Sequence, residues 1–153
     1  MEQKYNTNLA SEFYVMSMLY RLGLDAYLTL GNKKGVDIVL RNTDGSSISI
    51  EVKGVNKKTD DWPLSSKDIS LSANLFYILI SYESEIGNLL IHPHLWIIPA
   101  NLIADKCKKA QTKTGKYLYY MSHKVIREQF DDYKNNWQIL QTQLLTNTNR
   151  LFL

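Results

Sequence analysis

Cysteine is almost absent from this 153-residue sequence, which contains Cys107 alone. A single cysteine excludes an intramolecular disulfide and therefore a small disulfide-stapled secreted domain. The chain shows no signal peptide and no apolar run long enough to cross a bilayer, so we expect a cytoplasmic protein that does not contact membranes. Histidine and cysteine never cluster at the spacing of a zinc site.

Several catalytic signatures are missing as well. The sequence contains no Gly-rich phosphate loop, no Gly-x-Ser-x-Gly elbow and no other evident nucleophile–base pair. It also lacks repeats, low-complexity stretches and a recognisable domain linker. With 44% hydrophobic residues, residues 1–153 fit one globular domain with a real core.

Positive charge is in modest excess, with 18 Lys and Arg against 15 Asp and Glu. This balance permits nucleic acid as a partner without requiring it. Two lysine pairs, Lys33-Lys34 and Lys57-Lys58, flank one predicted hairpin. A run of lysines is also typical of a solvated face, and this alternative stays open for a later cluster. That cluster consists of Lys106, Lys108, Lys109, Lys113 and Lys116.

Residues 35–41 and 47–54 predict a β-hairpin, because apolar residues alternate with polar ones in both runs. Each run has an apolar set of even-numbered residues. The two sets lie on one face only if even-numbered residues of the first run pair with even-numbered residues of the second, which excludes a two-residue turn. A three-residue loop of Thr43, Asp44 and a left-handed Gly45 satisfies this condition. The apolar sets are Val36, Ile38 and Leu40 in the first run and Ile48, Ile50 and Val52 in the second.

The same register places three ionic residues on the opposite face of the hairpin. Asp37 lies opposite Glu51, with Cβ atoms about 4.5–5.5 Å apart, and Lys53 follows two residues along. Two carboxylates so close repel one another unless a cation lies between them, and a hard ion such as Mg²⁺ suits their oxygens. By pattern alone, a solvated polar face with a surface salt bridge remains an equal alternative.

Residues 7–23 predict a helix that ends at Gly23. Glu12 aligns with Val15 and Leu19 and points toward the core side, where an unpaired carboxylate is costly. Glu12 therefore either has a cationic partner or lies at the edge of the apolar stripe and reaches water. The stripe is formed by Leu9, Phe13, Met16 and Tyr20.

The remaining patterns predict short strands and two further helices. Residues 55–72 are polar and predict a loop with at most one short helix, near 66–73. Trp62 in this segment either stacks on a nucleic-acid base or plugs the sheet edge, and the plug is slightly favoured. His92 and His94 favour structural or surface roles over metal binding. Strands are predicted at 25–30, 75–82, 89–91, 95–99 and 117–121, and helices at 100–110 and 123–145.

The motif Val36-Asp37, followed after thirteen residues by Glu51-Val52-Lys53, resembles the PD-(D/E)xK nuclease superfamily. The preceding helix glutamate, Glu12, makes the pattern most similar to the Holliday-junction-resolvase and RecB-like branches. The resemblance implies the restriction-endonuclease-like fold of the α/β class. Its αβββαβ core, a mixed central sheet flanked by helices, covers residues 8 to about 82, with a C-terminal strand and helix as additions.

The sequence departs from the superfamily pattern in two places. Val36 stands where the name of the superfamily has proline, a common variation. The crossover helix expected between Gly54 and Leu75 is only weakly signalled, because that segment is serine-rich and contains Pro63.

The resemblance also implies roles for individual residues. Asp37 and Glu51 would bind Mg²⁺ or Mn²⁺, and the backbone carbonyl of Val52 would complete the site. Lys53 would orient the attacking water and stabilise charge on the phosphate, and Glu12 would support the metal directly or through water. The expected nucleic-acid contacts are Lys33, Lys34, Lys57, Lys58 and Trp62.

These roles together predict a Mg²⁺-dependent nuclease that hydrolyses DNA, working as a homodimer or with a partner protein. Two alternatives remain from the sequence. One is a catalytically inactive nuclease fold that only binds nucleic acid. The other is a protein-interaction or immunity-type module whose ten tyrosines and three tryptophans form a partner surface.

Overall fold

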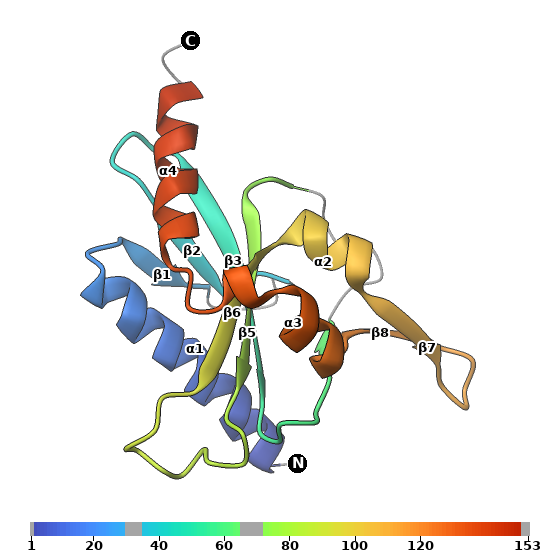
Figure 1. Cartoon of the computed structure of the whole chain (residues 1–153). Coiled ribbons are helices and arrows are strands. Elements are labelled where there is room, and N and C mark those ends of the chain that lie inside the picture. Colours follow the sequence, from blue (N-terminus) through green and yellow to red (C-terminus); the bar gives the residue numbers. More distant parts are fainter. Residues whose placement is uncertain (1, 30–34, 65–71, 151–153) are drawn as a thin grey trace.

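The computed structural model describes residues 2–29, 35–64 and 72–150. A mixed five-stranded sheet forms its centre, with helices on both faces (Figure 1). The elements, in chain order, are α1 (Glu2–Arg21), β1 (Ala26–Leu28), β2 (Ile38–Arg41), β3 (Ser47–Val55), β4 (Trp62–Leu64), β5 (Leu75–Ser81), β6 (His94–Pro99), α2 (Ala100–Lys106), β7 (Lys108–Gln111), β8 (Tyr117–Met121), α3 (His123–Gln129), the 3₁₀ turn η1 (Asp131–Tyr133) and α4 (Gln138–Arg150).

The central sheet has the strand order β1-β2-β3-β5-β6. β1, β2 and β3 form an antiparallel meander, β3 pairs with β5 in parallel, and β6 returns antiparallel to β5. Every residue of β5 is buried, as its continuous apolar sequence predicted for a central strand. The predicted α/β class and mixed sheet flanked by helices are thus confirmed.

Two hydrophobic layers cover the two faces of this sheet. α1 and α4 pack on one face, which carries Ile38, Ile50 and other aliphatic residues. α2, α3 and a smaller sheet with the order β4-β8-β7 lie against the other face. None of the described helices has the length and apolar character that crossing a bilayer requires.

The predicted hairpin register is confirmed over β2 and β3. Ile38 pairs with Ile50 and Leu40 with Ile48, and all four side chains are buried on one face. The loop is Thr43-Asp44-Gly45, as the parity argument required, and Gly45 adopts a left-handed φ of +85°. The regular pairing ends at Ile38 and Ile50, and the backbone amide of Asp37, which precedes β2, donates a 2.9 Å hydrogen bond to the Ile50 carbonyl.

The buried stripe of α1 differs from the predicted one. Phe13 and Tyr20 are 59% and 58% exposed, so the apolar spacing indicated the wrong face. The helix approaches β3 closely where Ser11 and Thr7 lie against Gly54, which has no side chain. The residues that face the sheet are Thr7, Ser11, Val15 and Leu19.

The predicted helix at 123–145 is also wrong, because the segment is broken into α3, η1 and α4. Asn135 adopts a left-handed φ of +52°, and its backbone N–H donates a 3.1 Å hydrogen bond to the Leu95 carbonyl at β6. Lys134 forms an isolated bridge with Trp96 on the same strand. Contacts with the sheet edge therefore interrupt a helical apolar pattern.

Three smaller predictions need correction. Residues 89–91 form turns instead of a strand, and the helix predicted for 100–110 ends at Lys106 because β7 begins two residues later and pairs with β8. β4 is an unpredicted strand that pairs with β8 within the segment expected to be a loop. Most of the short helix predicted near 66–73 lies outside the described residues.

Candidate catalytic site

Glu51 lies in the middle of β3 and is 1% exposed. Its carboxylate oxygen Oε1 is 2.9 Å from the Lys53 ammonium, which projects from the same strand two residues later. Tyr77 is its neighbour in the parallel register with β5. Burial, followed by the charge of Glu51 and a hydrogen bond to it, raises the pKa of the Tyr77 hydroxyl, so this group stays a donor.

Asp37 immediately precedes β2 and is partly buried. Its Oδ2 accepts a 2.7 Å hydrogen bond from the backbone amide of Val52, between Glu51 and Lys53. Burial raises the pKa of Asp37, and the charge of Glu51 adds to the increase, while the Val52 hydrogen bond and Lys53 oppose it. The side chain is thus tied to the Glu51-Val52-Lys53 segment by geometry and by charge.

Glu12 extends this cluster from α1. The side chain is partly buried, as its position on the core side of the helix predicted. Burial raises the pKa of Glu12 most, the negative charge of Asp37 raises it further, and Lys53 lowers it. The structure therefore brings Glu12, Asp37, Glu51 and Lys53 into one electrostatic cluster.

Gly54 explains how α1 comes close enough to contribute Glu12. A Cβ atom at this position would lie 2.0 Å from the Ser11 Oγ and 3.1 Å from the Thr7 carbonyl oxygen. Only glycine fits at such a contact between helix and strand. Because Ser11 precedes Glu12 and Lys53 precedes Gly54, this contact sets the spacing between the two ionic residues.

The donor chemistry of the cluster fits a hard divalent cation. Carboxylate oxygens are the preferred ligands of Mg²⁺, and the ammonium of Lys53 already pairs with one of them. Among the described residues, no three His, Cys, Asp or Glu side chains lie close enough together to hold a metal. A metal here would therefore take Asp37 and Glu51 and complete its shell with backbone oxygen and water.

A groove of about 1,030 Å³ adjoins this cluster at Lys53, the one member of the cluster that lines it. Lys53, Gly54 and Lys57 line it at the end of β3 together with Asp60 and Asp61, and Lys58 is exposed in the same turn. The N-terminal half of α1 forms one wall, and β4 and β8 form the other. Two of the predicted nucleic-acid contacts, Lys33 and Lys34, lie outside the described residues.

No model of a known protein family matches the chain, and no curated protein matches it. A solved structure, described as that of the bacterial homing endonuclease I-Ssp6803I, matches with a TM-score of 0.54 and 13% sequence identity, over 96% of this chain and 98% of the other. This chain shares that endonuclease's fold. The match bears out the restriction-endonuclease-like architecture that the sequence predicted.

Trp62 does not have the nucleic-acid-stacking role predicted as one alternative. Its side chain is 0% exposed, and its Nε1 donates a 2.9 Å hydrogen bond to the Ile80 carbonyl. It packs edge to face against Trp96, with ring centroids 5.8 Å apart. Trp62 is therefore part of the core between the two sheets, close to the plug alternative.

Sequence reasoning missed Tyr77, Ser11 and Gly54. Tyr77 is the one tyrosine in the apolar run of β5. Its hydroxyl group was the only feature of the sequence that indicated a polar contact there. Its proximity to Glu51 depends on the parallel register between β3 and β5, which the sequence does not show. Ser11 and Gly54 lie far apart in the sequence, and nothing local predicts their contact.

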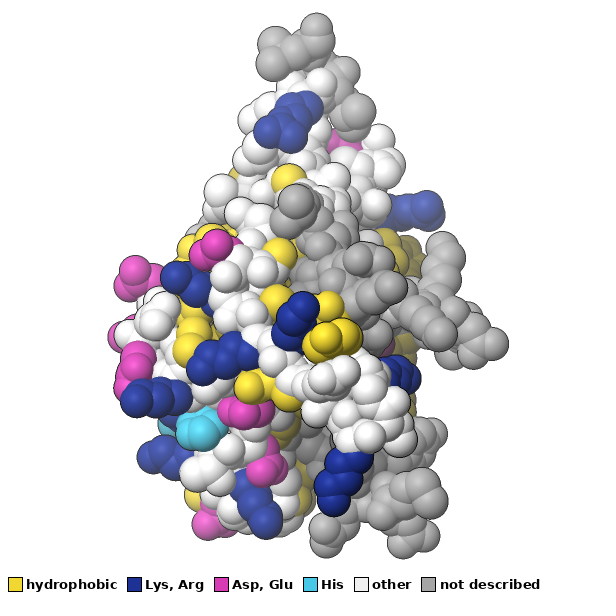
Figure 2. All heavy atoms as spheres, turned by 90° about the vertical axis from the view of Figure 1, so that its right-hand side faces the viewer, with side chains coloured by type: hydrophobic (Ala, Val, Ile, Leu, Met, Phe, Trp, Pro, Cys, Tyr) yellow, Lys and Arg dark blue, Asp and Glu magenta, His cyan; other side chains and the backbone are white. Residues whose placement is uncertain are grey.

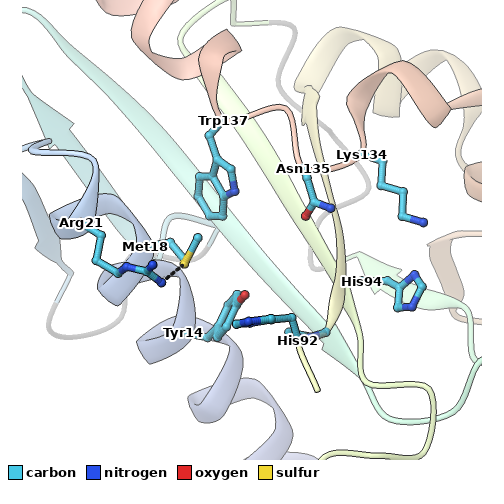
Figure 3. Close-up of a pocket in the computed structure, with 9 residues that line it drawn as sticks. Tyr14, Met18, Arg21, His92, His94, Lys134, Asn135 and Trp137 are labelled. Carbon is cyan, nitrogen blue, oxygen red and sulfur yellow. Dashed lines mark hydrogen bonds between the residues drawn. The ribbon is translucent and has the colours of Figure 1, made fainter. Parts of the chain in front are cut away.

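A second hollow, of about 510 Å³, lies away from the predicted site residues (Figure 3). Tyr14 and Arg21 of α1 line it together with His92, His94 and the segment 134–137. The two imidazole rings point away from each other in the close-up, which does not suit a shared metal. This arrangement agrees with the structural or surface role expected for the histidines.

His94 gives a prediction about the pH dependence of stability. Burial most strongly lowers its pKa, Lys134, Arg127 and Lys58 lower it further, and Glu83 opposes them. At pH values between the lowered pKa of His94 in the folded protein and its value of about 6.5 in the unfolded chain, the unfolded state binds more protons than the folded state. The folded protein therefore loses stability as the pH falls from 7.5 to 5.5.

His94→Phe is expected to remove part of this loss, because phenylalanine keeps the stacking on Trp96 and cannot titrate. Thermal unfolding midpoints of both proteins at pH 7.5 and 5.5 measure the effect. An equal fall in both proteins would contradict the assignment to His94.

Proposed function

We propose that this protein is a Mg²⁺-dependent nuclease that hydrolyses phosphodiester bonds of DNA. The observation that carries the proposal is the cluster of Glu12, Asp37, Glu51 and Lys53, whose lysine also lines a large groove. Buried carboxylates cost free energy unless a partner compensates them, so their retention at a cleft is typical of a functional site. The likeness in fold to a homing endonuclease supports this proposal.

In this proposal, Asp37 and Glu51 hold the ion, and the Val52 carbonyl is the third protein ligand. The hydrogen bond from the Val52 amide fixes Asp37 against the strand that carries the other two ligands. When bound, Mg²⁺ or Mn²⁺ supplies positive charge beside the scissile phosphate. Glu12 orients the ion or its water from α1.

Lys53 acts on the reacting phosphate and the attacking water. Its ammonium is a compact charge, and at 21% side-chain exposure it remains reachable from the groove. The ion pair with Glu51 fixes its position before DNA binds. Positive charge that is already in place when negative charge develops on the phosphate lowers the barrier to hydrolysis.

The groove is the proposed path of the DNA backbone, with Lys57 and Lys58 at its exposed end and Lys33 and Lys34 as further contacts. A single catalytic cluster cuts one strand at a time. We therefore infer that a homodimer or a partner protein is needed to cut both strands.

The test is a cleavage assay on supercoiled, linear and branched DNA in Mg²⁺, Mn²⁺ or EDTA. We expect cleavage with either metal and none in EDTA. Asp37→Ala and Lys53→Ala should each abolish it, and Lys124→Ala, an exposed lysine on α3, serves as the matched control. Cleavage by either Asp37→Ala or Lys53→Ala would contradict the proposed catalytic site.

One observation favours a second candidate, a nuclease fold that binds DNA without cutting it. The Lys53 ammonium already pairs with Glu51, so this buried carboxylate is compensated without a metal. Binding of DNA without cleavage under every metal condition would favour this candidate.

A further inference from the structure

The β7–β8 hairpin projects away from the central sheet (Figure 1). Residues 108–121, which form it, include four lysines and no acidic residue. Every residue of β7 is exposed, and in β8 only Met121, at the base, is buried. The hairpin is thus a basic two-stranded ribbon that is anchored at one end, where β8 pairs with β4.

The tip of the ribbon is held by its own hydrogen bonds. The backbone amide of Thr112 donates to the Lys116 carbonyl at 2.8 Å, and the amide of Gly115 donates to the Thr112 carbonyl at 2.9 Å. Gly115 has a left-handed φ of +80°, as a three-residue hairpin loop of this kind requires. Lys113 and Lys116 are therefore presented from an ordered loop.

One face of the ribbon continues the groove that begins at Lys53. Ala110 pairs with Leu118 and Lys108 with Tyr120, so these side chains share a face. Ala110, Leu118 and Tyr120 also line the groove. A duplex lying in the groove would consequently meet the ribbon beside the catalytic cluster.

Apolar side chains on the ribbon remain in water. Tyr117 is 49% exposed and Leu118 is 53% exposed, and the Lys109 ammonium lies 4.7 Å from the centre of the Tyr117 ring. Figure 2 looks at this side of the molecule and shows Lys and Arg side chains spread over it, with hydrophobic side chains directly beside some of them. Lysine charge with exposed apolar surface is complementary to phosphates, base edges and thymine methyl groups.

We propose that the β7–β8 ribbon enters the major groove of duplex DNA and reads base sequence next to the cleavage site. The inference rests on the proposed function for its substrate. A two-stranded ribbon fits the major groove, which is about 12 Å wide. The ribbon enters with its tip first, so side chains on both of its faces meet the walls of the groove. Lys113 and Lys116 contact phosphates. Gln111, paired with Tyr117 on the face opposite Ala110 and Leu118, exchanges the 3.2 Å hydrogen bond from its Nε2 to the Gly115 carbonyl for a contact with a base edge.

The experiment first selects duplexes from a random-sequence library with the wild-type protein in EDTA, so that binding is measured without cleavage. The selected duplex is then remade with 7-deazapurines, which removes the N7 acceptors of the major groove and leaves the minor groove intact. We expect the wild type to bind the ordinary duplex about 10-fold more tightly than the 7-deaza duplex.

The test variant combines Gln111→Ala, Lys113→Ala and Lys116→Ala, all at exposed positions. It should lose the preference between the two duplexes and reduce the salt dependence of log Kd by about 1.8, for two lost phosphate contacts. Arg41→Gln with Arg150→Gln removes the same charge from exposed positions on β2 and α4 and should retain the preference. Unfolding midpoints verify that all variants are folded.

The outcomes separate this inference from the proposed function. A wild type that selects no sequence, or binds both duplexes equally, overturns the ribbon as a reader. A test variant that keeps the preference for the ordinary duplex also overturns the ribbon as a reader. Cleavage in Mg²⁺ is scored separately, so a selective protein that never cuts contradicts the nuclease and supports the ribbon. Cleavage by a protein without sequence preference supports the nuclease and contradicts the ribbon as a reader.

Discussion

Glu51→Gln is expected to lower the rate of metal-dependent DNA cleavage by about 10³-fold while leaving the protein folded. Glutamine has the shape of glutamate and keeps an oxygen that accepts from Tyr77 and Lys53. It lacks the charge that holds a divalent cation. Initial cleavage rates in Mg²⁺ and the thermal unfolding midpoint measure the two parts of the prediction.

Glu85→Gln, at an exposed position beside Asn88, is the matched control and should change neither quantity. Undiminished cleavage by Glu51→Gln would exclude Glu51 as a metal ligand. Unfolding of Glu51→Gln would contradict the predicted stability, because the glutamine amide is expected to make the same hydrogen bonds as the glutamate.

Glu51→Ala should behave differently, since it leaves the Lys53 ammonium and the Tyr77 hydroxyl without their common partner. Loss of one member of a buried ion pair costs about 3 kcal/mol in the free energy of unfolding. Adding Lys53→Met to Glu51→Ala should recover part of this loss, because the 2.9 Å ion pair couples the two residues. Denaturant unfolding of the two single variants and the double variant measures the coupling, and strict additivity would contradict it.

Gly54→Ala is expected to lower the free energy of unfolding by about 2–3 kcal/mol and to impair cleavage as well. The new methyl group would lie 2.0 Å from the Ser11 Oγ and 3.1 Å from the Thr7 carbonyl oxygen, and the latter belongs to backbone that cannot rotate away. α1 must therefore move from β3 and take Glu12 with it. Chemical denaturation and cleavage rates measure the two effects.

Gly87→Ala provides the control, because a Cβ atom there would meet nothing within 4 Å. It should leave the free energy of unfolding within about 0.5 kcal/mol of the wild-type value. Ser11→Ala combined with Gly54→Ala should recover only part of the lost stability, since the contact with the Thr7 carbonyl remains. Full stability of Gly54→Ala alone would show that α1 does not depend on this contact.

The hairpin was the most predictable part of the fold. Alternation of side chains along a strand follows from backbone geometry, and the need to bury both apolar sets on one face fixed the parity of pairing between β2 and β3. The three-residue loop ending in Gly45 followed from that parity. The proximity of Asp37 to the Glu51-Val52-Lys53 segment therefore followed from local rules.

Helical patterns were less informative, because they show which residues are apolar and not what each face will meet. In α1, Ser11 faces the sheet because Gly54 allows a close approach, and Phe13 is left exposed. After α3, the contacts of Asn135 and Lys134 with β6 break a pattern that is helical by spacing. Neither outcome has a signal within its own segment.

By itself, the sequence determined the β2–β3 register and the grouping of Asp37 with Glu51 and Lys53, because both depend on residues close together in the chain, whereas the class of fold followed from the resemblance to a nuclease superfamily. Only the tertiary structure decided that Trp62 is core, that Tyr77 hydrogen-bonds Glu51 and that Gly54 positions α1. These contacts join distant segments, and their free energy depends on packing and burial that no local pattern contains. The residues of the candidate catalytic motif are thus close together in the sequence, whereas the contacts that hold them in place join distant segments of the chain.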